Sequence, residues 1–216
     1  IMRRWDEAKV PQRFRFFRLR GSPVEERIKS RLMSPFPAWE AASAQLADDA
    51  EETEDDLFEK MVRPWLGSWL FWGGYGVGKT GLAVGYAYES LEGMDGHLAG
   101  VRFVSMPDFL SELRDTYRKE GGSEKAIIEQ YREPELLILD DLGAEHVKDS
   151  GWLEDRLYQL IGHRHADEKD TVFTSNLSPA ELGARIGERN MWRIVEMCGQ
   201  DHLVHIEGPN LRESKR

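Results

Sequence analysis

The sequence predicts an α/β fold in which a five-stranded parallel sheet is covered by helices on both faces. Two observations carry this prediction. Short apolar segments alternate with segments of helical periodicity from residue 68 onward. One apolar segment, ELLILD (135–140), is a continuous run, as expected for a strand that is buried on both faces of a parallel sheet.

The expected strands are short and regularly distributed. They are SWLFW (68–72), VRFVS (101–105), ELLILD (135–140), TVFTSN (171–176) and a last strand within HLVHIEG (202–208). Between them, apolar residues recur at helical spacing. The two clearest sets are Phe109, Leu110, Leu113 and Tyr117, and then Leu153, Leu157, Leu160 and Ile161. Strand and helix therefore alternate as in a parallel sheet.

Two more helices are predicted before the last strand. Ser178, Pro179 and Glu181 supply an N-cap, a first-turn proline and a capping-box acid, so a helix begins there. Gly187 is expected to end it. The apolar face of the second helix consists of Met191, Ile194, Val195 and Cys198.

The composition fits one domain with a charged N-terminal extension. The chain has 216 residues, of which 40% are hydrophobic, enough to bury a full core. Residues 1–31 carry ten Lys or Arg against four Asp or Glu, whereas the whole chain has a formal net charge of −10. We expect residues 1–65 to form a basic arm, an acidic run (47–56) and leading helices, and residues 66–216 to form the main domain.

The single cysteine, Cys198, excludes a disulfide within the chain and indicates a reducing compartment. No run of about eighteen apolar residues is present, and the start of the chain lacks the pattern of a secretory signal. We therefore expect a cytoplasmic protein that does not contact a membrane.

One motif predicts a phosphate site. GGYGVGKT fits the pattern G-x-x-x-x-G-K-[ST], with Gly73, Gly78, Lys79 and Thr80 at its fixed positions. Polyphosphate needs several backbone N–H groups directed at one point, and glycines allow that curvature. Lys79 adds a charge for the outer phosphates, and Thr80 offers a hydroxyl to Mg²⁺. The predicted ATP- or ADP-binding loop also includes Gly74, Gly76, Val77 and Gly81. The alternative is a glycine-rich turn with an incidental lysine.

Polar side chains end two of the predicted strands. Asp140 and Asp141 follow the buried run, where paired acids are costly unless a cation meets them. We predict that Asp140 binds Mg²⁺ beside Thr80 and that Asp141 polarises the attacking water, although Asp141 is alternatively a cap on the next turn. Asn176 ends TVFTSN, where it either orients water or contacts the terminal phosphate, or is an ordinary turn residue.

These motifs together resemble those of AAA+ ATPases. A strand, P-loop and helix, then LLILDDLGAE, then FTSN, is the order of Walker A, Walker B and sensor 1 in that class. LDDLGAE with TSNLSPAEL is similar to the branch of DnaC/DnaI helicase loaders, which includes the IstB-like transposition helper ATPases. The resemblance covers residues 66–212, and KVPQRFR (9–15) looks like the segment that precedes the domain in that family. It implies a P-loop NTPase fold with little or no separate lid domain.

The resemblance also implies roles for three polar side chains. The strand that ends at Asn176 is expected between the Walker A and Walker B strands, which would bring its amide to the phosphates. GERNMWRI matches the segment that carries an arginine finger at Arg193, which acts on the ATP of a neighbouring subunit. Helical periodicity separately turns Arg193 outward, with Arg189 on the same face as the fallback. IEGPNLR matches sensor 2, which implies that Arg212 contacts the phosphates of its own subunit.

The sequence departs from the family pattern in two ways. The second Walker B acid is Asp141 where most AAA+ proteins have glutamate, so hydrolysis is expected to be slow. Loaders also carry an N-terminal domain that binds the replicative helicase, sometimes with zinc, and no metal-ligand cluster precedes the P-loop here. A basic and aromatic segment, QRFRFFRLR (12–20), suits contacts with single-stranded DNA but equally suits packing within the fold or over the adenine.

The leading hypothesis is an ATP-hydrolysing helicase loader that acts in DNA replication. It would bind single-stranded DNA and a replicative DNA helicase, and would form a homo-oligomer when ATP is bound. One alternative is an IstB-like transposition helper that acts on duplex DNA with a transposase. Another is a nucleotide-gated DNA-binding module with negligible turnover.

Overall fold

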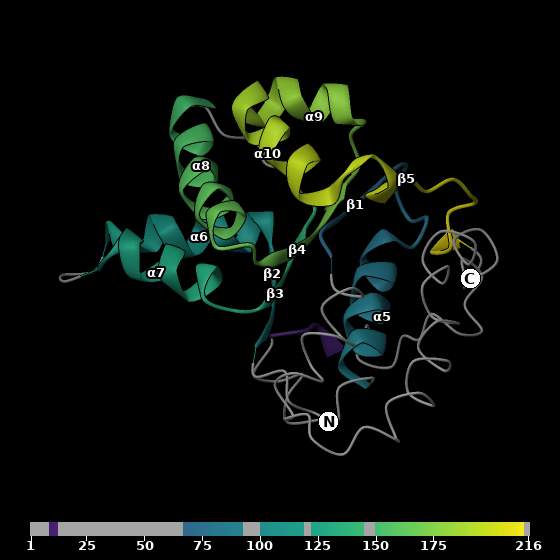
Figure 1. Ribbon diagram of the computed structural model, residues 1–216, viewed down its shortest axis with the longest axis horizontal. Coiled ribbons are helices and arrows are strands. Elements are labelled where there is room, and N and C mark those ends of the chain that lie inside the picture. The colour runs from purple at the N-terminus through teal and green to yellow at the C-terminus, as the bar shows by residue number, and fades with distance from the viewer. Residues whose placement is uncertain (1–8, 13–66, 93–99, 119–121, 145–149, 214–216) are drawn as a thin grey trace, which may run out of the picture.

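A five-stranded parallel sheet runs through the middle of the molecule (Figure 1). The computed structural model describes residues 9–12, 67–92, 100–118, 122–144 and 150–213. The strands are β1 (Trp69–Trp72), β2 (Val101–Ser105), β3 (Leu136–Asp140), β4 (Asp170–Ser175) and β5 (Leu203–His205). Their spatial order is β2-β3-β4-β1-β5, and each neighbouring pair is parallel. The predicted sheet is confirmed, and β4 lies between β1 and β3 as the family resemblance implies.

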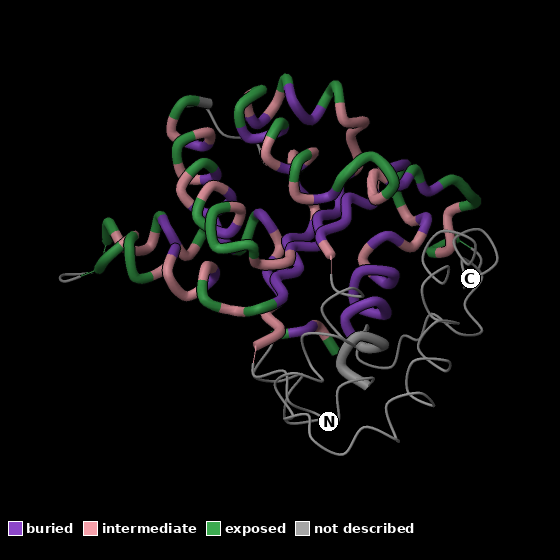
Figure 2. The backbone as a smooth tube through the Cα atoms, in the orientation of Figure 1, coloured by how far each residue is buried: buried purple, intermediate pink, exposed green. Residues whose placement is uncertain are grey.

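Helices cover both faces of the sheet, but unequally. On one face lies α5 (Lys79–Glu92). On the other lie α6 (Met106–Thr116), α7 (Glu124–Arg132), α8 (Ser150–Ala166), α9 (Pro179–Ile186) and α10 (Glu188–Cys198). Successive side chains of a strand point to opposite faces, so Trp69 and Phe71 pack with α5 whereas Leu70 packs with the other helices. Figure 2 shows buried residues concentrated on the strands and on the start of α5.

The predicted helix start at Ser178 is confirmed. The Ser178 hydroxyl accepts a hydrogen bond from the Glu181 N–H at 3.4 Å, and the Glu181 carboxylate accepts one from the Ser178 N–H at 2.9 Å. The helix ends at Ile186, as expected, with Gly187 as its C-cap at a φ of 87° that favours glycine. The next helix, α10, turns the predicted apolar face inward. None of the described helices is both long and apolar enough to cross a membrane.

Two details differ from the sequence expectation. Tyr117 was expected to continue an apolar helical stripe, but α6 ends at Thr116 and the Tyr117 side chain is 64% exposed. The short helix α7 was not expected. Its buried residues are Ile128 and Tyr131, which are too few to show a helical period in the sequence.

Most of the predicted N-terminal region, residues 1–65, lies outside the described residues, including the acidic run and nearly all of segment 12–20. The exception is residues 9–12. Val10 is 1% exposed and belongs to the core on the α5 face of the sheet. Lys9 forms an ion pair with Glu112 of α6 at 3.0 Å. Residues 9–12 therefore pack against the main domain.

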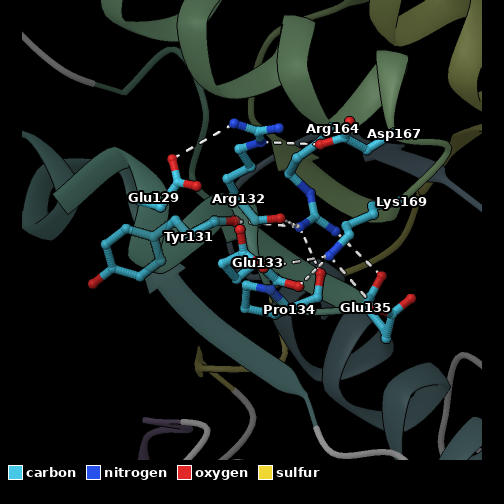
Figure 3. A network of polar contacts seen from close by, with 9 residues as sticks. All are labelled: Glu129, Tyr131, Arg132, Glu133, Pro134, Glu135, Arg164, Asp167 and Lys169. Carbon is cyan, nitrogen blue, oxygen red and sulfur yellow. Dashed lines mark hydrogen bonds and ion pairs between the residues drawn. The ribbon is translucent and has the colours of Figure 1, made fainter. Parts of the chain in front are cut away.

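A buried arginine on α8, Arg164, joins this helix to α7, to β4 and to the loop that precedes β3 (Figure 3). Its guanidinium donates to the Thr171 hydroxyl and to five backbone carbonyls, those of Tyr131, Arg132, Pro134, Glu135 and Asp170. Two of these carbonyls lie in the last turn of α7, where a helix carries partial negative charge. Burial lowers the pKa of Arg164 to about 10, so the side chain remains charged at neutral pH.

We predict that Arg164→Met strongly destabilises the fold. The substitution leaves several buried carbonyls without a donor, and breaking such a network costs about 3–5 kcal/mol. Urea unfolding measures the change. The matched control is Arg132→Met, since Arg132 forms exposed ion pairs with Glu129 and Asp167 in the same network. An equal loss in both variants would show that Arg164 has no special role.

Candidate functional site

The loop between β1 and α5 has the curvature that its glycines predict. Gly73, Gly76 and Gly78 have φ values of 145°, 75° and 103°, a region that other residues adopt only with strain. The Gly73 N–H donates to the Ser175 carbonyl of β4 at 3.2 Å, which fixes the start of the loop. The Leu82 N–H donates to the Gly78 carbonyl at 3.0 Å, which fixes its end as the first turn of α5.

The start of α5 favours an anion. The first N–H groups of a helix have no partner inside the helix, and they carry the positive end of its dipole. The first turn of α5 contains no acidic residue that would compete for these groups. The loop and helix therefore offer converging N–H donors to a phosphate.

The Lys79 ammonium lies over its own loop. It donates to the carbonyls of Gly73 and Gly74 at 2.9 and 2.7 Å and to Asn176 Oδ1 at 2.7 Å. Burial lowers the pKa of Lys79, while the charges of Asp141 and Asp140 act in the opposite direction and Arg212 adds to the lowering. The structure thus brings Asn176 to the P-loop lysine, and phosphate oxygens would supply Lys79 with stronger acceptors.

Asp140 is a buried carboxylate held by two hydroxyls. It is 4% exposed, and it accepts hydrogen bonds from Thr174 Oγ1 at 2.6 Å and from Thr80 Oγ1 at 3.2 Å. Burial raises the pKa of Asp140 to about 6. A cation would offset this desolvation, and a hydroxyl beside a carboxylate is a donor set that fits Mg²⁺. The structure therefore brings the two predicted metal ligands, Thr80 and Asp140, together.

Asp141 begins a turn through its backbone. It adopts a φ of 57°, its N–H donates to Thr174 Oγ1 at 2.9 Å, and its carbonyl accepts from the Ala144 N–H at 3.1 Å. Within the described residues, the Asp141 carboxylate takes no hydrogen bond. The turn interpretation thus describes the backbone of Asp141.

Thr174 is a site residue that the sequence analysis misses. Its side chain is fully buried in β4, where its hydroxyl contacts both the Asp140 carboxylate and the Asp141 N–H. It thereby fixes the orientation of the acid pair. The available signal was weak, because Thr174 is one of three hydroxyl residues in β4, and only its place two residues before Asn176 distinguishes it from Thr171.

The predicted finger residue, Arg193, lies on α10 and contacts α8. Its guanidinium lies 4.4 Å from the ring centroid of Tyr158, and that of Arg189 lies 5.5 Å from the same ring. Arg189 is exposed, whereas Arg193 is half-buried against α8, so the predicted outward orientation holds for Arg189 more fully than for Arg193. Among the described contacts, none joins Arg193 to the P-loop of its own chain.

The predicted sensor 2 residue, Arg212, lies near the P-loop. The N–H of the preceding residue, Leu211, donates to the Gly76 carbonyl at 3.0 Å. The Arg212 charge reaches Lys79, since it contributes to lowering the pKa of that lysine. The Arg212 side chain is exposed.

We predict that Asp140→Asn stabilises the protein when nucleotide and metal are absent. The folded-state pKa of about 6 is above the ordinary value of 3.8, so ionising Asp140 opposes folding. This cost is complete above pH 6 and fades as the pH falls toward 3.8. Urea unfolding should therefore show a gain of about 3 kcal/mol near pH 8, shrinking at lower pH. The control is Asp155→Asn, at a side chain that is 70% exposed. A gain that does not depend on pH would contradict the assigned cause.

Comparison with known proteins gives consistent matches. The model of the family described as IstB-like ATP binding protein matches residues 69–216. The replicative helicase loader DnaC of Escherichia coli K12 is 28% identical over 131 residues, which are 60% of this chain and 50% of DnaC. The replicative helicase loader DnaI of Bacillus subtilis 168 is 31% identical over 112 residues, 51% of this chain and 33% of DnaI. The chain thus matches half or less of the length of these relatives.

Solved structures agree on the fold. A crystal structure of the DnaC helicase loader has a TM-score of 0.62 at 23% identity, covering 91% of this chain and 100% of that one. The replication initiator DnaA bound to AMPPCP and single-stranded DNA has a TM-score of 0.55 at 21% identity, covering 73% and 45%. The chain belongs to the IstB-like ATP binding protein family and has the AAA+ P-loop fold of its structural neighbours.

Proposed function

We propose that this protein binds and hydrolyses Mg²⁺-ATP and acts as a helicase loader in DNA replication. The observation that carries the proposal is the contact chain at one edge of the sheet. Asn176 accepts from Lys79, and Thr80 donates to Asp140, which lies beside Asp141. These are the side-chain types that phosphoryl transfer from ATP requires, and they come from three neighbouring strands or the loops that follow them.

In the proposed mechanism, the loop of residues 73–81 binds the phosphates through its N–H groups, and Lys79 exchanges its loop acceptors for phosphate oxygens. Mg²⁺, when bound, neutralises charge on those oxygens, and Thr80 and Asp140 would hold it. Asp141 orients the attacking water, and Asn176 contacts that water or the terminal phosphate. Catalysis is then mostly positioning and electrostatic stabilisation.

Two arginines complete the proposed site. Arg212 contacts the phosphates from its own chain, which the hydrogen bond of the preceding Leu211 N–H to the Gly76 carbonyl supports. Arg193 acts on the ATP of a neighbouring subunit in an ATP-bound homo-oligomer, which the match of GERNMWRI to the arginine-finger segment of the loaders supports. Hydrolysis is slow, because the shorter Asp141 side chain holds the attacking water less closely than a glutamate would. Hydrolysis depends on the oligomer, because Arg193 acts between subunits.

The proposed partners are a replicative DNA helicase and single-stranded DNA. DnaC and DnaI are named as replicative helicase loaders, and a DnaA structure of the same fold contains single-stranded DNA. The match covers half of DnaC, so the contact with a helicase is proposed for this chain from similarity to only part of that loader. A transposition helper is the second candidate, because the family model carries the IstB name. A nucleotide-gated module without turnover is the third.

We expect the protein to retain a replicative helicase of the same cell in an ATP-dependent pull-down, and to prefer single-stranded over duplex DNA. That DNA affinity should fall steeply with salt, because phosphate contacts release counterions. Capture of a transposase together with preference for duplex DNA would favour the second candidate instead. Hydrolysis that stays at background with DNA and partner present would favour the third.

We predict that Arg193→Ala retains ATP binding but lowers hydrolysis by about a thousandfold, since an arginine finger acts on the transition state. Mixing Arg193→Ala with Asp141→Asn subunits should restore part of the activity, because some interfaces then combine an intact Arg193 with an intact Asp141. Arg189→Ala is the matched control, because Arg189 lies over the same tyrosine ring. No recovery on mixing, or an equal loss in the control, would contradict the assignment.

A further inference from the structure

The chain that follows β5 lies directly against the P-loop. At the start of the loop, the Ile206 N–H donates to the Trp72 carbonyl at 2.7 Å, and a Cβ on Gly73 would lie 2.2 Å from the Ile206 carbonyl oxygen. At its tip, the Leu211 N–H donates to the Gly76 carbonyl at 3.0 Å. The segment after β5 therefore contacts the phosphate loop at two separate points.

Asn210 organises the second contact. Its Oδ1 accepts from the Arg212 N–H at 3.0 Å, and its Nδ2 donates to the Glu213 carboxylate at 3.1 Å. The Asn210 carbonyl accepts from the Glu213 N–H at 3.1 Å, which closes a turn over residues 210–213. This turn contains Leu211, whose side chain also packs against the core on the α5 face. The Asn210 side chain thus fixes the turn that presents the Leu211 N–H to the loop.

The fit between Asn210 and the loop is close. A Cβ on Gly76 would lie 1.9 Å from Asn210 Oδ1, so a side chain at position 76 would displace the asparagine from its present position. Gly76 also has a φ of 75°. Position 76 is a variable position of the P-loop pattern, and its glycine fits both the positive φ and the approach of Asn210.

The Leu211 contact determines which way one peptide group of the loop faces. In a trans peptide, the carbonyl of one residue and the N–H of the next point in opposite directions. Because Leu211 holds the Gly76 carbonyl, the Val77 N–H is directed away from the segment after β5. Backbone N–H groups are the phosphate donors of a P-loop. A peptide fixed in this orientation does not have to be ordered when a ligand binds, which raises affinity.

We propose that Asn210 is a positioning residue for the phosphates of ATP. Through the turn of residues 210–213 it holds the Leu211 N–H on the Gly76 carbonyl, and this orients the Val77 N–H as a phosphate donor. The same turn carries Arg212, so one side chain sets both the tip of the loop and the arginine beside it. The inference rests on the proposed function, because it requires polyphosphate in the loop.

The test measures binding of ATP, ADP and inorganic tripolyphosphate, each with Mg²⁺, by calorimetry or competition. Asn210→Ala should weaken all three about five- to tenfold, as expected for loss of one orienting hydrogen bond. Tripolyphosphate has no base or sugar, so an equal loss places the effect in the phosphate loop. Asn210→Ser should recover affinity to within about twofold, since a serine hydroxyl accepts from the N–H two residues on. Glu207→Gln, on the same segment with a side chain that is 79% exposed, should bind as the wild type does.

The outcomes separate the inference from the function on which it rests. A wild-type protein that binds none of the three probes would refute the ATP site itself. Wild-type binding that Asn210→Ala leaves unchanged, or a loss confined to ATP and ADP, would overturn the role of Asn210 alone. The melting temperature without ligand should be similar in all variants. If Asn210→Ala has a lower melting temperature, binding is compared between the wild type and Asn210→Ser instead. Weak polyphosphate binding by an Asn210→Ser protein of wild-type melting temperature would overturn the proposal.

Discussion

The parallel pairing of β1, β4 and β3 is the constraint on which the site depends. Trp72 pairs with Ser175 and Leu139 with Phe173, so these strands end at the same edge of the sheet. The loop after β1, the acid pair at the end of β3 and the amide after β4 therefore meet although they are far apart in the sequence. The short contacts of Lys79 with Asn176 and of Thr80 with Asp140 follow from this register.

Without its ligand the site lowers the stability of the fold, because it buries charged groups. Neighbouring hydrogen bonds offset part of this loss. Burial disfavours the charged forms of both Lys79 and Asp140, as the directions of their pKa shifts show. Backbone carbonyls and an amide satisfy the lysine, and two hydroxyls satisfy the aspartate. Each of these contacts is replaceable by a phosphate or a cation. A buried site of this kind trades stability for ligand binding.

Much of the fold and of the candidate site was predictable because the signals are local. Apolar runs determine the strands, the Ser178 capping box determines a helix start, and the glycine spacing determines the loop. The remainder depends on contacts between distant segments. Thr174 and Asn210 act on residues that no sequence pattern places next to them. The burial of Arg164 could have been inferred from the sequence, because Arg164 follows Leu157 and Leu160 at helical spacing on the buried face of α8. A charged residue on such a face needs hydrogen-bond partners.

The central claim is that the P-loop binds a polyphosphate through Lys79 and the surrounding N–H groups. Calorimetric titration of Mg²⁺-ATP into the wild type and into Lys79→Ala tests it most directly, with Lys125→Ala, an exposed lysine on α7, as the control. The account predicts that the wild type and the control bind with similar affinity and that Lys79→Ala shows no measurable binding. Equal affinity in all three proteins would contradict it.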